Sequence, residues 1–105
     1  PSTLFLVATP IGNLEDITLR ALRVLRECDL VAAEDTRRTG QLLKHFGISK
    51  PLLSYFQFNE AKRSEEIIER LRRGEKVALV TMTGLALLSE PLRSRVPAET
   101  VVGPV

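Results

Sequence analysis

Apolar and polar residues follow two different periods along this 105-residue chain. Short, almost wholly apolar runs are typical of buried strands, and apolar residues three or four positions apart are typical of amphipathic helices. The runs predict strands at Leu4–Ala8, Leu30–Ala33, Pro51–Tyr55, Val77–Thr81 and, more briefly, Val101–Val102. The wider spacing predicts helices at Leu14–Cys28, Thr36–Phe46 and Glu60–Arg73, with Asn13 and Asn59 as N-caps and Gly47 and Gly74 just past two helix ends.

Strands and helices alternate in this pattern, and the strands are apolar at nearly every position. Such strands are buried on both faces, so we expect a three-layer αβα domain with about five mostly parallel strands and right-handed crossovers. The length fits one domain over residues 1–105. In open sheets of this kind, ligands bind beyond the carboxyl ends of the strands. Functional residues are therefore expected in the segments that follow the strands.

Composition narrows the picture only a little. Hydrophobic residues make up 44% of the chain and charged residues 27%, an ordinary balance for a globular domain. The net charge of +2 is too small to indicate nucleic-acid binding by itself. Cys28 is the only cysteine, so an internal disulfide is excluded and a cytoplasmic location is expected. No apolar run reaches the roughly 20 residues of a membrane-spanning helix, and no membrane partner is expected.

The first segment after a strand is Thr9–Asn13, with the sequence TPIGN. Pro10 stiffens this turn, and Gly12 would let a ligand approach the backbone ahead of a helix N-terminus, where free amides attract anions. The segment has neither the G-x-G-x-x-G pattern nor the P-loop pattern, so no nucleotide site is predicted by motif. A simple strand-to-helix turn is the other interpretation, and the physical pattern by itself favours it.

The segment after the second strand, Glu34–Thr39, carries more reactive groups. It reads EDTRRT and holds two carboxylates, two hydroxyls and two guanidiniums. Asp35 or Thr36 could cap the next helix, which is the default structural role. The functional alternative is a carboxylate that orients a hydroxyl or removes its proton, beside two arginines that bind phosphate. Two arginines in the first turn of a helix interact unfavourably with its dipole. This cost is weak support for a functional role of the two arginines.

The remaining candidates have mainly structural interpretations. His45 stands near a helix end, and Cys28 has no evident base partner, so both are expected to be structural. The spacing of His and Cys suggests no metal site. Tyr55, Phe56 and Phe58 could stack on a nucleic-acid base, although aromatic residues of the core are the commoner case.

Taken together, three segments resemble one known family. They read VATPIGNLEDITLRALRVL, DLVAAEDTRRTGQLLKHFGI and FNEAKRSEEIIERL, and EKVALVT follows them. These segments are similar to the N-terminal domain of the tetrapyrrole (corrin/porphyrin) methylase family, in its branch that methylates ribosomal RNA. The resemblance runs from about Leu4 to Thr81, and the pairing of ATPIGNLEDIT with AAEDTRRT is its most specific part.

The resemblance implies S-adenosylmethionine as methyl donor, a cytidine ribose 2′-hydroxyl of small-subunit (16S) ribosomal RNA as acceptor, and a homodimer. It implies that the donor contacts Thr9, Pro10, Ile11, Gly12, Thr83 and Gly84. It implies that the RNA substrate faces Glu34, Thr36, Arg37, Arg38 and Asn59. Asp35 is the candidate that takes the hydroxyl proton, and no metal is expected.

The chain departs from the family pattern in ways that keep alternatives open. After Thr81, Met82 stands where the family has an acidic residue, and Leu85–Ala86 replaces a Thr-Pro pair, in a loop that normally carries donor contacts. The family's C-terminal domain, the other wall of the cleft, is expected to be absent from these 105 residues, so the isolated chain is expected to be inactive. One alternative is a non-catalytic domain that dimerises or binds RNA. A weaker alternative is methylation of a small tetrapyrrole.

Overall fold

The computed structural model describes residues 2–10, 12–56, 58–81, 92, 95–97 and 100–104. The strands are β1 (Thr3–Ala8), β2 (Leu30–Ala33), β3 (Leu52–Ser54), β4 (Lys76–Thr81) and β5 (Val101–Pro104). The helices are a short 3-10 turn, η1 (Leu14–Asp16), and the α-helices α1 (Leu19–Glu27), α2 (Thr36–His45) and α3 (Glu60–Arg72). Within these ranges, no helix has the length and apolar character needed to cross a membrane.

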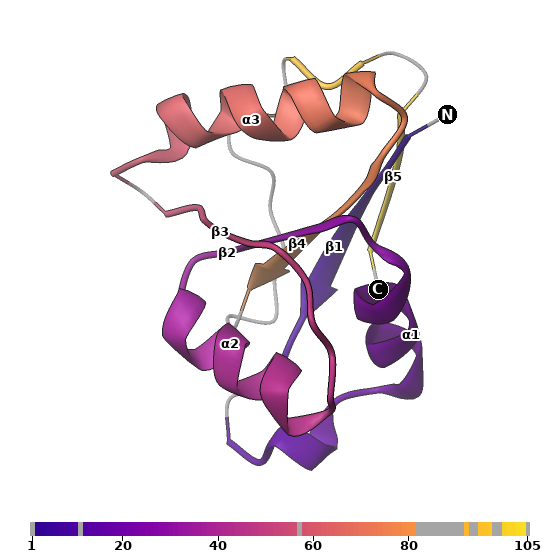
Figure 1. Cartoon of the computed structure of the whole chain (residues 1–105), viewed down its shortest axis with the longest axis vertical. Helices are drawn as coiled ribbons and strands as arrows, with labels where there is room; N and C mark the ends of the chain where they lie inside the picture. The colour runs from indigo at the N-terminus through magenta and orange to yellow at the C-terminus, as the bar shows by residue number, and fades with distance from the viewer. Residues whose placement is uncertain are drawn as a thin grey trace.

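The strands form one sheet in the order β3-β2-β4-β1-β5, and every described pairing is parallel. Val80 of β4 lies opposite both Val7 of β1 and Ala33 of β2, so the three strands run in step. Their carboxyl ends consequently meet at one edge of the sheet (Figure 1). The predicted parallel sheet of about five strands is confirmed.

Helices cover both faces of the sheet. In Figure 1, α3 lies on one side of the strands and α1 and α2 lie on the other. One core cluster joins Leu25 of α1 and Leu42 of α2 to strand residues such as Val80. A second cluster joins Ile67 of α3 to the opposite face, including Val77. The strand side chains alternate between these two clusters because successive residues of a strand point to opposite faces, and the predicted three-layer αβα fold is confirmed.

The predicted helix Leu14–Cys28 is wrong at its beginning. Asn13 caps only η1, since its side chain accepts a hydrogen bond from the Glu15 amide at 3.0 Å. Ile17 is extended, and the Thr18 hydroxyl then caps α1 by accepting the Ala21 amide at 3.0 Å. Ile17 and Thr18 are both β-branched, and Thr18 is also a strong N-cap residue. Together they favour the start of a new helix over continuation of the first one. The α-helix N-terminus that was predicted to follow the TPIGN turn therefore lies further along the chain.

Two predicted helix ends are confirmed by backbone geometry. Gly47 and Gly74 have φ values of 68° and 82°, in the left-handed region that glycine adopts without steric cost. They follow α2 and α3, and each turns the chain back toward the next strand.

Candidate functional site

Hydrogen bonds connect three strand ends at the carboxyl edge of the sheet. The backbone amide of Thr9, after β1, donates to the Thr81 carbonyl of β4 at 2.9 Å, and the Thr9 hydroxyl approaches the same oxygen at 3.2 Å. The Thr81 hydroxyl donates to Glu34 Oε1, after β2, at 3.4 Å. Thr81 is almost fully buried, and these bonds connect the two predicted segments through it. Thr81 was not among the predicted site residues, because a threonine that ends an apolar run has no distinctive pattern.

Asp35 is the N-cap residue of α2, as the structural interpretation predicted. Its Oδ1 accepts the backbone amide of Arg38 at 3.0 Å, which satisfies one of the free amides in the first turn. Thr36 is the first residue of the helix, and Arg37 and Arg38 follow within the first turn. This cap orients the turn, so the two guanidiniums and the Asp35 carboxylate are presented together at the edge.

A solvent-open hollow of about 340 Å³ lies between the two predicted segments. Its lining residues are Gly12, Leu14, Asp35, Arg37, Arg38 and Gln41. Ligand clefts in proteins commonly begin at about this size. Four of the six lining residues were predicted from the sequence. Leu14 and Gln41 were missed, although Gln41 lies one helical turn after Arg37 and could have been found from that spacing.

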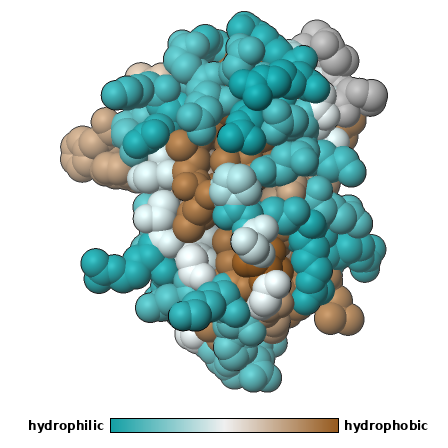
Figure 2. Space-filling model, in the orientation of Figure 1, coloured by the Kyte–Doolittle hydropathy of each residue, from teal (hydrophilic) through white to brown (hydrophobic). Residues whose placement is uncertain are grey.

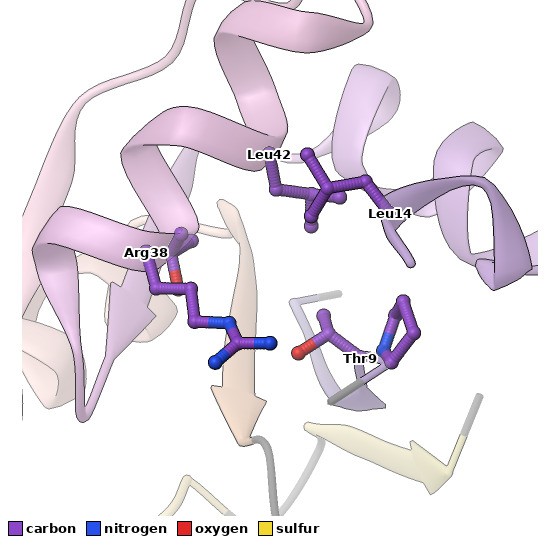
Figure 3. Close-up of a pocket in the computed structure, with 6 residues that line it drawn as sticks. Thr9, Leu14, Arg38 and Leu42 are labelled. Atoms are coloured by element: carbon purple, nitrogen blue, oxygen red, sulfur yellow. The ribbon is translucent and has the colours of Figure 1, made fainter. Parts of the chain in front are cut away.

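A much smaller cavity of about 10 Å³, room for about one water molecule, adjoins this hollow through shared residues. It is lined by Thr9, Pro10, Leu14, Arg38, Thr39 and Leu42. Figure 3 shows the Arg38 guanidinium extending toward Thr9, while Leu14 and Leu42 lie together on the other side. The TPIGN turn and the EDTRRT segment, distant in sequence, are therefore neighbours.

Gly12 is needed neither for backbone strain nor for packing. Its φ is not in the left-handed region, where Gly47 and Gly74 are the described examples. No described atom lies within 4 Å of the position that a Cβ would take at Gly12. The fold would therefore accept a side chain here, and that side chain would project into space beside the hollow.

The other predicted site residues are less central. Ile11, Thr83 and Gly84, together with Met82 and Leu85–Ala86, lie outside the described residues. Asn59 follows β3, and its side chain forms hydrogen bonds with Ser54 and Phe56 rather than lining the hollow. Asn59 is the N-cap residue of α3, as predicted, but its side chain makes no capping hydrogen bond.

A larger hollow of about 420 Å³ lies elsewhere, against the C-terminal half of α2 and the residues before β3. Its lining includes Gly40, Lys44, Gly47, Lys50 and Leu52. Because Gly47 and Lys50 precede β3, this hollow is not at the carboxyl ends of the strands, where parallel sheets bind ligands. Its residues carry neither a carboxylate nor a paired guanidinium, and we do not assign it the chemistry of the site.

Two reactive side chains have structural surroundings. Cys28 is fully buried, and burial raises the pKa of its thiol to about 11, so almost no thiolate forms at neutral pH. His45 packs its ring edge-on against Phe46 with centroids 4.8 Å apart. Among the described residues, no group of His, Cys, Asp and Glu is arranged to hold a metal ion.

Comparison with known proteins matches the chain to one family and to several named relatives. Residues 3–99 match the family model described as Tetrapyrrole (Corrin/Porphyrin) Methylases. A protein from Thermotoga maritima named Ribosomal RNA small subunit methyltransferase I is 56% identical over 88 residues, 84% of this chain. Proteins of the same name from Pseudomonas aeruginosa and Escherichia coli O157:H7 are 56% and 50% identical, over 85% and 84% of this chain.

The match covers only part of each relative. It spans 40% of the Thermotoga maritima protein, 32% of the Pseudomonas aeruginosa protein and 31% of the Escherichia coli protein. Within this chain, the family model extends over nearly all of the described sheet and over both segments at its carboxyl edge. The chain belongs to the tetrapyrrole (corrin/porphyrin) methylase family.

Proposed function

We propose that this chain is the N-terminal domain of an S-adenosylmethionine-dependent methyltransferase that acts on small-subunit ribosomal RNA. One observation carries the proposal: the TPIGN turn and the EDTRRT segment together line a solvent-open hollow at the carboxyl edge of a parallel sheet. The relatives with this name support the choice of substrate. The homodimer implied by the resemblance remains a prediction.

The residues of the hollow fit a methyl donor of this class. The hollow can hold part of a ligand the size of a nucleoside, and it is open to solvent. Gly12 leaves space beside it, so a ligand can approach the backbone there. The residues proposed to hold the donor are Thr9, Pro10, Ile11, Gly12, Thr83 and Gly84. When bound, S-adenosylmethionine supplies a methyl group on a positively charged sulfur.

The basic residues suit the other substrate. Arg37 and Arg38 extend from the first turn of α2, where guanidiniums are mildly unfavourable unless they meet an anion. Phosphates of an RNA backbone are bound by arginine through paired, charge-assisted hydrogen bonds. We propose that these two arginines, with Glu34 and Thr36 of the same segment, position the RNA strand at the edge of the hollow. Asn59, whose side chain bonds to Ser54 and Phe56, would contribute through the turn that it holds.

Asp35 is proposed to remove the proton from the ribose hydroxyl. One of its oxygens is held by the Arg38 amide, which fixes the carboxylate in a single orientation. The other oxygen remains available on an exposed side chain that lines the hollow. Methyl transfer depends mainly on positioning and on a base within hydrogen-bond reach of the attacking hydroxyl.

The proposal is tested by calorimetric titration of the chain with S-adenosylmethionine and with S-adenosylhomocysteine. We expect binding of both, and we expect Gly12→Val to weaken it at least tenfold, since two methyl groups would occupy space beside the hollow. Because no described atom obstructs a side chain there, thermal stability should change little, which separates lost binding from lost folding.

Lys44→Ala, in the hollow before β3, is the matched control and should leave donor affinity unchanged. Failure of the unaltered chain to bind either compound would contradict the proposed donor site. That result would favour the non-catalytic alternative, a domain that dimerises or binds RNA.

A further inference from the structure

The turn between β3 and α3 exposes two aromatic rings. Phe58 is 85% exposed and Phe56 is 39% exposed, and their rings pack edge to face with centroids 6.0 Å apart. Figure 2 shows hydrophobic side chains protruding at the side of the molecule where Figure 1 places this turn. The expectation of core aromatics is thus confirmed for Tyr55, which is buried, and wrong for Phe56 and Phe58.

Asn59 holds this turn in shape. Its side-chain oxygen accepts the Phe56 amide at 2.8 Å, and its amide group donates to the carbonyl and hydroxyl oxygens of Ser54 at 3.3 and 3.2 Å. The Asn59 backbone amide also donates to the Phe56 carbonyl at 2.9 Å. Below the turn, the Tyr55 hydroxyl and the Ser64 hydroxyl share a buried hydrogen bond of 3.0 Å. These hydrogen bonds fix the backbone of Phe56 relative to Asn59, which lowers the entropy cost of binding.

This aromatic turn, Phe56 to Asn59, lies on the same edge as the candidate site. Strand β3 pairs with β2, with Ser54 opposite Ala33, and the Tyr55 amide donates to the Ala33 carbonyl at 2.8 Å. The residues directly after β2 lead to Arg37 and Arg38. The exposed rings and the two guanidiniums therefore extend from neighbouring strand ends.

Further positive charge follows the aromatic turn in α3. Lys62 is exposed, and Arg63 has a buried Nε without a hydrogen-bond partner in the described structure. Both residues lie at the beginning of α3, within four residues of Asn59. Exposed aromatic rings flanked by cations are the combination that binds unpaired nucleotides, through base stacking and phosphate contacts.

We propose that Phe56 and Phe58 form a stacking platform for an unpaired base of the RNA substrate, with Asn59 as the residue that positions them. This inference deepens the proposed function and rests on it. Arg63 and Lys62 would hold the phosphates on the α3 side, opposite Arg37 and Arg38.

The test is fluorescence anisotropy with a labelled single-stranded oligoribonucleotide of about ten nucleotides, within the site size of single-strand binders. Phe58→Ala is expected to weaken binding roughly 5- to 150-fold, the range for loss of one stacked base. Phe58→Trp should retain affinity because it retains a flat ring. Leu19→Ala removes an equally exposed apolar side chain from α1 and should have no effect. A duplex of the same sequence should bind more weakly than the single strand.

Several results would overturn the inference. Equal affinity of Phe58→Ala and the unaltered chain for the single strand would exclude stacking at this turn. Binding of S-adenosylhomocysteine by the chain without binding of the oligoribonucleotide would also exclude it, while leaving the donor site intact. A shift of sedimentation from dimer to monomer in Phe58→Ala, with RNA affinity unchanged, would show that a second copy of the chain covers the rings.

Discussion

Replacing Asp35 by asparagine is expected to lower methyl transfer roughly 100- to 10,000-fold, the usual contribution of a positioned general base. The measurement uses a chimera in which residues 3–81 of this chain replace the matching residues of the Thermotoga maritima relative, assayed with labelled donor and small-subunit ribosomal RNA. Asparagine is as good an N-cap as aspartate, so it preserves the hydrogen bond from the Arg38 amide. The substitution therefore removes the base and leaves the helix start in place.

Two companion variants separate the roles of this carboxylate. Asp35→Ala removes both the base and the cap, and should cost about 0.5–2 kcal/mol of stability in addition to the loss of rate. Glu34→Gln changes the adjacent carboxylate, whose contact with Thr81 is long at 3.4 Å, and should lower the rate less than tenfold. A rate that survives Asp35→Asn but collapses in Glu34→Gln would assign the proton to Glu34 instead.

Replacing Leu25 by alanine is expected to destabilise the chain by about 2–5 kcal/mol, the range for a buried leucine whose removal leaves a cavity. Leu25 is fully buried in the cluster between α1, α2 and the sheet. The control lies in the same helix: Leu19 is 80% exposed, so Leu19→Ala should change stability by less than about 0.5 kcal/mol. Urea unfolding followed by circular dichroism measures both.

The sheet could be predicted because its strands are apolar at nearly every position. Val77 to Val80 are buried on alternate faces by α3 and by α1 with α2, and only a parallel sheet covered on both sides requires such a run. The two site segments could be predicted for the same reason, since they directly follow these runs. Their meeting at one hollow follows from the strand order, in which β1 and β2 both flank β4.

The sequence patterns did not predict the start of α1 or the exposure of Phe56 and Phe58. In both places, local hydrogen bonds compete with the apolar pattern. Thr18 and Asn13 are both good N-cap residues ahead of the same apolar pattern, and periodicity alone does not choose between them. Phe56 and Phe58 are aromatic, which is typical of core residues. The hydrogen bonds of Asn59 close a turn that leaves both rings exposed to solvent. Thr81 joins the site through the fold, since its hydrogen bonds to Thr9 and Glu34 follow from strand order and not from a motif.

The central claim is that the carboxyl edge of this sheet binds the methyl donor. Backbone amide chemical shifts of the chain, recorded by NMR during titration with S-adenosylhomocysteine, test it most directly. The account predicts saturable shifts largest at Thr9, Gly12, Asp35 and Arg38, which surround the hollow between the two segments. Unchanged amides at these positions, or shifts centred on Lys44 and Lys50 in the hollow before β3, would contradict it.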